Sequence, residues 1–239
     1  MRFFDMHSHI LPDFDDGAKN IEDALQLIDS LKNQNITNIC LTPHFYTDEI
    51  SVEEFVEKRN EAFEKFKSHI PKDIKVVLGA EVYVTKYLFG NDDLSKITYG
   101  NSKYILTEYG YSDKFGNSTM EYFYRLHDNF GLIPVIPHIE RYSALIDNPS
   151  RIAELREMGV VIQTNISSYI KKSPMLKRKK LIKLINEGMI DIIGSDAHSF
   201  EYNSPKFYSQ AIEYITSKCG EHTVAKMMSN AEHIFEASL

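Results

Sequence analysis

The sequence predicts an α/β fold in which a parallel sheet closes, or nearly closes, into a β/α barrel. Short apolar segments alternate with segments of helical periodicity, and seven such units follow one another along the chain. Strands joined through helices form parallel sheets with right-handed crossovers. Polar residues stand at the ends of the apolar segments, and in a β/α barrel these ends converge on one rim. We expect residues 1–239 to form a single domain of this kind.

The first half of the chain supplies four of the expected strands. They are predicted at 2–6, 37–41, 74–80 and 104–107. The segments between them show helical spacing of apolar residues, which predicts helices at 21–31, 52–66 and 119–130. The strands are apolar throughout, as expected of strands that are buried on both faces.

The second half continues the alternation, with strands predicted at 132–136, 160–164 and 190–193. A helix is predicted from Asn148-Pro149 to Met158, because proline suits the first helical turn and Gly159 suits the position after the last. The segment "SPMLKRKKLIKLINEG" has the same proline start and glycine stop. The last expected helix covers approximately 206–218.

The composition limits the classes of function. The formal net charge of −7 argues against a general nucleic-acid-binding protein, which needs a basic face. No apolar run is long enough to span a bilayer, and no signal peptide opens the sequence, so we expect a cytoplasmic protein without direct membrane insertion. Only Cys40 and Cys219 occur, which fits a reducing compartment. Neither is followed six residues later by arginine, so a Cys-x5-Arg phosphatase loop is missing.

Residues of metal-ligand type gather at the strand ends. His7 and His9 stand at i and i+2 in an extended segment, which places both imidazoles on one face. Asp196 and His198 repeat this spacing in "GSDAH", and six of the seven expected strands end in a nitrogen or carboxylate ligand. The candidate metal ligands are His7, His9, Asp16, His44, Glu81, Glu108, His138, Asp196 and His198.

This set is too large for one ion, since first-row metals take about four to six ligands. Two or three divalent ions that share bridging carboxylates fit better, and the mixture of imidazole with carboxylate suits Mn, Fe or Zn. The alternative is a coincidence of structural polar groups, which the common register of the ligands disfavours. Of the adjacent Asp15 and Asp16, we expect one to face the metals and the other to cap the helix after Gly17.

The ordered motifs "MHSHILPDFDDGAKN", "TPH", "GAEVY", "TEYGY", "PHIERY" and "GSDAH" resemble those of the polymerase-and-histidinol-phosphatase (PHP) superfamily. Within it, the chain is most similar to the bacterial tyrosine-protein phosphatases of capsule and exopolysaccharide clusters, from Met1 to about Phe235. Amidohydrolases are less similar, because they commonly carry a metal-bridging lysine where Glu108 stands.

The resemblance implies a distorted seven-stranded β/α barrel, a centre of two or three ions supplied mostly with Mn, and hydrolysis of phosphomonoesters. The implied substrate is the phosphotyrosine tail of a bacterial tyrosine kinase that controls capsule and exopolysaccharide synthesis. In this reading Asp16, His44 and Arg141 are catalytic residues. Arg141 lies three residues after His138 and would stabilise charge on the phosphoryl oxygens.

One departure concerns the second basic residue. Relatives tend to carry an arginine five residues after the histidine of the Asp-x-His motif, where this chain has Asn203. Lys206 lies close by and would bind phosphate as a point charge, without the bidentate fork of arginine. We therefore expect Arg141, Lys206 and Asn203 to line the substrate site.

Three other functions remain open from the sequence. The first is a PHP phosphomonoesterase that acts on a small metabolite such as histidinol phosphate. The second is a PHP nuclease, which the acidic composition disfavours. The third is a metal-bound regulator that binds phosphotyrosine with little turnover, a reading that Asn203 keeps open.

Overall fold

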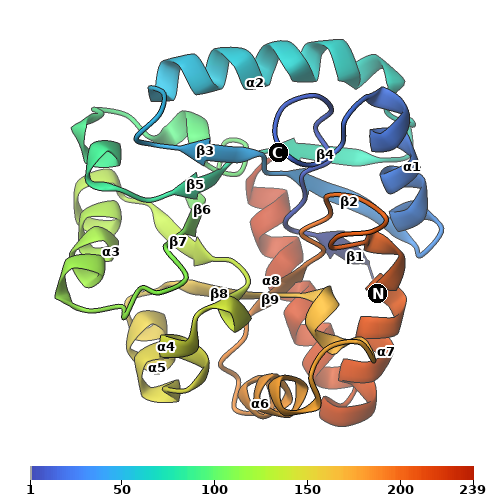
Figure 1. Cartoon of the computed structure of the whole chain (residues 1–239), viewed down its shortest axis with the longest axis vertical. Helices are drawn as coiled ribbons and strands as arrows, with labels where there is room; N and C mark the ends of the chain where they lie inside the picture. The colour runs from blue at the N-terminus through green and yellow to red at the C-terminus, as the bar shows by residue number, and fades with distance from the viewer. Residues whose placement is uncertain (1) are drawn as a thin grey trace.

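Nine parallel strands run through the middle of the molecule, and helices cover them from outside (Figure 1). This computed structural model describes residues 2–239. The strands are β1 (Phe3–Asp5), β2 (Ile36–Leu41), β3 (His44–Tyr46), β4 (Lys75–Leu78), β5 (Glu81–Tyr83), β6 (Tyr104–Glu108), β7 (Ile133–Ile136), β8 (Val161–Asn165) and β9 (Ile192–Gly194). The α/β class with parallel sheets is thus confirmed.

The expected count of seven strands in one barrel is not confirmed, and the described strands do not form one closed sheet. The described strands form two sheets, one of three strands in the order β1-β2-β4 and one of six in the order β3-β5-β6-β7-β8-β9. The sheets approach each other through a parallel bridge between Ser8 and Ala197, which lie just after β1 and β9.

The count differs because each of the predicted strands 37–41 and 74–80 is followed, after a short break, by a further strand. The chain leaves β2 at Leu41, passes Pro43 and resumes as β3, and the neighbouring chain is broken between β4 and β5. Pro43 has no N–H to donate to a ladder. Its carbonyl still accepts a hydrogen bond from the amide of Glu81 at 2.9 Å, and Gly79 donates to Leu41 at 2.8 Å. The two interrupted strands therefore stay side by side across the break.

The helices largely follow the predicted periodicity. They are α1 (Ile21–Lys32), α2 (Val52–Phe66), α3 (Asn117–Phe130), α4 (Ser143–Ile146), α5 (Pro149–Glu157), α6 (Met175–Asn186), α7 (Tyr208–Cys219) and α8 (Glu221–Ala237). Gly159 and Gly188 follow α5 and α6 with φ of 86° and 69°, a left-handed conformation that favours glycine. None of the helices described over residues 2–239 combines the length and hydropathy that a membrane crossing requires.

Helix α8, the longest helix described, was not predicted from the sequence. Its buried residues recur at helical spacing, and they are Val224, Met227, Met228, Ala231, Ile234 and Phe235. Phe235 packs against Phe4 of β1 with ring centroids 5.5 Å apart. Ala231, Ile234 and Phe235 also join the inward-facing side chains of six strands in one buried cluster. This helix therefore completes the core beneath the strands that carry the candidate ligands.

Candidate metal centre

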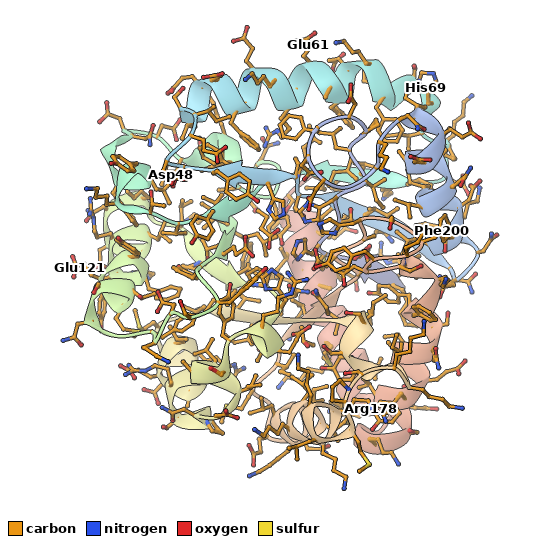
Figure 2. All side chains as sticks on the ribbon, in the orientation of Figure 1. Asp48, Glu61, His69, Glu121, Arg178 and Phe200 are labelled. Atoms are coloured by element: carbon orange, nitrogen blue, oxygen red, sulfur yellow. The ribbon has the colours of Figure 1, made fainter. Side chains whose placement is uncertain are left out.

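All nine predicted ligands come together at one end of the strands. His7 and His9 follow β1, His44 opens β3, Glu81 opens β5, Glu108 ends β6, His138 follows β7, and Asp196 and His198 follow β9. Figure 2 shows side-chain nitrogen atoms gathered in the middle of the ring of strands. Three clusters of ligand atoms can be distinguished there, each with its atoms within 4.8 Å of one another.

The inner group consists of His7, His9, Glu81 and Asp196, and all four side chains are buried. The Glu81 Oε2 atom lies 3.2 Å from the Nε2 atoms of both His7 and His9. The Asp196 Oδ1 atom lies 3.4 Å from the same two nitrogens. Two imidazole nitrogens and two carboxylate oxygens thus face a common point, which is the donor set of a first-row divalent metal.

The outer group consists of His9, Asp16, His44 and His198. The Asp16 Oδ1 atom lies 3.4 Å from His198 Nε2 and 3.7 Å from His44 Nε2. The Asp16 side chain is 69% exposed, whereas those of His44 and His198 are 14% and 6% exposed. This group is therefore the part of the centre that faces solvent.

A middle group of His44, Glu81 and Glu108 lies between the other two. His44 Nδ1 is 3.2 Å from Glu81 Oε2, and His138 Nε2 is 2.7 Å from Glu81 Oε1 and 3.6 Å from Glu108 Oε1. Glu81 Oε2 is therefore shared between the inner and middle groups, and Glu81 Oε1 faces His138.

Unsatisfied polar atoms show that the cluster fits divalent cations. Among the described residues, the buried atoms His44 Nδ1, His138 Nδ1 and Asp196 Oδ1 lack hydrogen-bond partners. The Nε2 atoms of His7 and His9 face each other at 3.1 Å, where two lone pairs would repel without a proton or cation between them. Buried polar atoms are normally satisfied, so these atoms have the chemistry of ligands that could hold cations.

The electrostatics of the cluster keep most ligands in the form that binds metal. Burial lowers the pKa of His44 and of His138, which keeps both imidazoles neutral. Burial alone would raise the pKa of Glu81, but the facing His7 and other imidazoles hold it well below its usual range. Three ligands differ. Burial and the nearby Glu81 charge raise the pKa of Glu108 to about 8. Burial alone would lower the pKa of His7 and of His9, but the carboxylates that face them raise it, so a bound cation would displace these protons.

Backbone strain accompanies two of the ligands. His138 and Asp196 have φ of 35° and 53°, in the left-handed region that non-glycine residues rarely adopt. Such residues cost of order 1–3 kcal/mol each and persist only where the surroundings impose them. At both positions the chain turns directly after a strand, and the turn aims the side chain into the cluster.

The structure distinguishes Asp15 from Asp16. Asp15 Oδ2 lies 2.7 Å from His9 Nδ1 and accepts a hydrogen bond from the His44 amide at 3.0 Å. Asp15 thereby fixes which His9 nitrogen faces the metals. The expectation that one aspartate caps the following helix is wrong, because Asn20 caps α1 through a bond from the Asp23 amide.

Gly17 allows this loop to fold back on His9. A Cβ atom at this position would lie 1.9 Å from the His9 carbonyl oxygen, so no larger residue fits. The next amide, that of Ala18, donates to the same carbonyl at 3.0 Å. The loop that carries both aspartates is therefore anchored to the histidine that it orients.

Strand β8 contributes orienting residues that the sequence analysis missed. Gln163 Oε1 accepts from the His138 amide at 3.0 Å, and Asn165 Nδ2 donates to Asp196 Oδ2 at 2.7 Å. Behind β9, the amide and hydroxyl of Ser195 donate to the Asp5 carboxylate. The sequence signal for these orienting residues is that β8 ends in buried polar residues, none of which is a common metal-ligand type.

Arg141 lies at the edge of the ligand cluster. Its guanidinium donates to Asp196 Oδ2 at 2.5 Å and to the Tyr111 hydroxyl at 3.1 Å. Burial lowers the pKa of Arg141, but the Asp196 carboxylate more than offsets this, so the side chain stays charged. Its side chain is 22% exposed and can therefore still meet a ligand.

The two other expected substrate contacts lie in different surroundings. Asn203 donates to Asp196 Oδ2 at 2.7 Å, beside the bond from Arg141 to the same oxygen. The recorded contacts of the Lys206 ammonium are the Phe200 carbonyl at 3.3 Å and the Phe207 ring. The structure thus places Asn203 at the cluster and records no contact of Lys206 with a ligand among residues 2–239.

Three tyrosines near the ligand cluster differ in their exposure. Tyr109 and Tyr142 are buried, and the Tyr142 hydroxyl accepts a hydrogen bond from the Tyr109 amide at 3.1 Å. Tyr111 is 53% exposed, and its hydroxyl donates to Glu108 Oε1 at 3.0 Å. Only Tyr111 of these three can therefore contact a substrate ring.

The comparison with protein families gives one match over nearly the whole chain. Residues 3–236 match the model for capsular polysaccharide synthesis proteins of the CpsB/CapC type.

Curated relatives with similar sequences share this description. The chain is 34% identical to a putative tyrosine-protein phosphatase CapC of Staphylococcus aureus over 82% of this chain and 76% of the relative. It is 31% identical to tyrosine-protein phosphatase CpsB of Streptococcus pneumoniae over 90% of each chain. With tyrosine-protein phosphatase YwqE of Bacillus subtilis the identity is 29%, over 95% of this chain and 89% of the relative.

Solved structures extend the comparison to the fold. A structure from the work on YwqE of Bacillus subtilis and CpsB of Streptococcus pneumoniae, described as unique metal-dependent tyrosine phosphatases, matches with a TM-score of 0.80. It is 26% identical and covers 99% of this chain and 96% of that one. A phosphotriesterase homology protein from Escherichia coli matches with a TM-score of 0.59 at 13% identity over 98% of each chain, which shows a shared fold alone.

Proposed function

The chain belongs to the CpsB/CapC family of capsular polysaccharide synthesis proteins, and we propose that it is a metal-dependent protein-tyrosine phosphatase. The observation that carries the proposal is the convergence of nine ligand-type residues beside one charged arginine. A cluster that fits several cations suits the transfer of a phosphoryl group, whose charge must be neutralised as the bond breaks.

We propose that the cluster binds two or three divalent ions, with Mn the first candidate and Fe or Zn the others. The inner, middle and outer groups would each hold one ion, with Glu81 shared between neighbours and His9 shared between the inner and outer groups. Support comes from the imidazole and carboxylate donors and from the absence of cysteine among the ligands. Bound ions would activate a water molecule for attack on phosphorus and neutralise the charge of the phosphate oxygens.

The chain's own residues would orient the substrate. Arg141 would donate its guanidinium to the phosphoryl oxygens, since it already points at the Asp196 carboxylate on the same edge. Tyr111 lies under the Arg141 guanidinium, with the carbon of that group 5.7 Å from the ring centroid, and would limit its movement. Asp16 and His44 would meet the substrate from the solvent-facing side, because both belong to the outer group.

Phosphotyrosine suits this arrangement better than an alkyl phosphate. The departing phenolate is a good leaving group, so the reaction depends less on a strong general acid. The proposed substrate is a phosphotyrosine tail of a bacterial tyrosine kinase that controls capsule or exopolysaccharide synthesis, in the cytoplasm. We further propose that residues 1–239 act as one catalytic domain. Hydrolysis of a small metabolite such as histidinol phosphate is the alternative activity.

The deciding experiment combines metal analysis with turnover. The purified protein would be stripped with a chelator, reloaded with Mn²⁺, Fe²⁺ or Zn²⁺, and assayed in parallel on a phosphotyrosine peptide and on histidinol phosphate. We expect hydrolysis of the peptide only in the loaded protein. Faster turnover of histidinol phosphate, or no turnover of either substrate with any metal, would contradict the proposal.

An Arg141→Ala variant tests the role of the arginine. We expect kcat/KM for the peptide to fall by roughly 10- to 100-fold, because a charge-assisted contact is worth about 1.5–3 kcal/mol. Lys206→Ala is the matched control that removes a cation recorded away from the cluster. Full activity in both variants together would mean that Arg141 does not bind the phosphoryl group.

A further inference from the structure

A large groove opens beside the outer group, and it is larger than a phosphotyrosine side chain alone requires. It lies between the loop that follows β1 and one face of α2, and its volume is about 1170 Å³. In Figure 1 this loop curls beneath α2, and Figure 2 labels Glu61 on that helix. Known small-molecule pockets span about 300–1,000 Å³, so the groove has room for more than one side chain.

The groove is continuous with the candidate metal centre. Asp16 and His44 of the outer group both line it. Tyr46 also lines it, stacks on the His44 ring at a centroid distance of 5.3 Å, and is 38% exposed. A molecule bound in the groove would therefore extend directly from a group held at the metals.

The length of the groove suits a short stretch of polypeptide. Its α2 wall runs from Phe55 to Phe66, and at 1.5 Å per residue this is about 16 Å of helix. An extended chain rises about 3.3 Å per residue, so roughly five residues would fit along this wall.

The lining favours an apolar side chain. Phe14, Ile50 and Ala62 lie along the groove and are each partly exposed. The lysines of its α2 rim are already paired, because Lys58 contacts Glu54 and Lys65 contacts Glu61, each at 2.7 Å. Lys19 lines the groove as well, but six carboxylates outnumber the three lysines of the lining, so the groove offers apolar surface and does not select an acidic peptide.

We propose that this groove binds the polypeptide on one side of the substrate phosphotyrosine, as an extended segment of about five residues with at least one apolar side chain. The proposal rests on the proposed function and adds a subsite for the polypeptide that flanks the phosphotyrosine. The groove residues other than Asp16 and His44 are specificity determinants and take no part in the chemical step.

The test separates binding in the groove from chemistry at the metals. Wild-type protein loaded with Mn²⁺ would be assayed on p-nitrophenyl phosphate, on phosphotyrosine, and on phosphotyrosine peptides that extend by two or five residues on either side. We expect the KM of the five-residue extension on one side to be at least tenfold lower than that of phosphotyrosine. Equal KM values for all lengths would overturn the proposal.

The variant Ala62→Trp would fill the groove, and Ala62→Leu would fill it in part. Ala62→Trp should raise the KM of the long peptide at least tenfold while p-nitrophenyl phosphate turnover stays within twofold, and Ala62→Leu should give an intermediate rise. Glu57→Trp, at an exposed position of α2 outside the groove, is the matched control and should behave as wild type.

Two outcomes would overturn the assignment of the groove. One is that Ala62→Trp impairs the hydrolysis of p-nitrophenyl phosphate as much as that of the long peptide. The other is that Glu57→Trp raises the KM of the long peptide as much as Ala62→Trp does. Failure of the proposed function is a different result, because the wild-type protein would then hydrolyse none of these phosphate esters with any metal.

Discussion

The inner and outer groups of the metal centre are built in different ways. The inner ligands His7, His9, Glu81 and Asp196 follow or open strands and are at most 1% exposed. The outer group includes Asp16, which lies on a loop, is 69% exposed and borders the groove. We propose from this difference that the buried inner group would retain cations and that the exposed outer group would admit the substrate.

The largest expected effect is the loss of activity in Asp196→Asn. One oxygen of this carboxylate faces the inner imidazoles, and the other accepts from Arg141, Asn165 and Asn203. The neutral amide of the Asn side chain would weaken cation binding by the inner group and would also release Arg141 from its position. We therefore expect kcat/KM on a phosphotyrosine peptide to fall by about a thousand-fold. Circular dichroism and metal content measured on the same sample would show whether the variant is folded and loaded. Near-normal turnover would mean that the inner group does not support catalysis.

The next effect is on stability. Ions that bind only the folded protein stabilise it by mass action, and at a hundred times Kd the gain is about 2.7 kcal/mol. For a chain of this size we expect Mn²⁺ to raise Tm by about 5–10 °C above the chelated protein. Glu81→Gln should lose most of this rise, and Asp16→Asn should keep most of it. An equal loss of the Mn²⁺-induced Tm rise in both variants would contradict the difference between the inner and outer groups.

A smaller effect is expected from Asp16→Asn on activity. The exposed outer group should lose affinity for its ion, and we expect the Mn²⁺ concentration for half-maximal activity to rise by roughly 10- to 100-fold. Excess Mn²⁺ should restore much of the turnover, which titration of activity against metal would reveal. Asp13→Asn, in the same loop, is a matched control that removes a carboxylate outside the three ligand groups. Activity that no amount of metal recovers would make Asp16 as essential as Asp196.

The smallest effect concerns pH and the middle group. Burial, followed by the charge of Glu81, raises the pKa of Glu108 to about 8 in the metal-free protein. The protonated form therefore prevails at pH 7, and the proton must leave before Glu108 can bind metal. Between pH 7 and 8 we expect the apparent Mn²⁺ affinity to increase roughly fivefold and then to level off. Calorimetric titrations of wild type and Glu108→Gln would test this, since the variant should lack that dependence.

One physical rule explains why the predicted ligand residues lie together in the structure. Strands that run parallel end at the same rim, so His7, Glu108 and Asp196 could be assigned to one site from their positions at strand ends. The same rule could not decide between Asp15 and Asp16, because loop geometry sets which of two adjacent carboxylates faces inward. The breaks at Pro43 and Gly79, which split the sheet, depend on long-range pairing that local periodicity does not contain.

The orienting residues and α8 were missed for different reasons. Gln163 and Asn165 are not metal-ligand types, and their roles become visible only when β8 lies beside β7 and β9. The α8 pattern of Val224, Met227 and Met228 is readable in the sequence, and it was overlooked because no ligand or strand follows it.

The bridge between Ser8 and Ala197 also has a consequence for synthesis on the ribosome. It joins the first strand to the last, so His7 and His9 cannot meet Asp196 and His198 until nearly the whole chain has emerged. Contacts this far apart in sequence slow folding, because a long loop must close before they form. The nascent chain would therefore expose His7 and His9 before Asp196 and His198 have been synthesised. Metal capture should then be a late event, and α8, which packs on β1 and β9, should complete it.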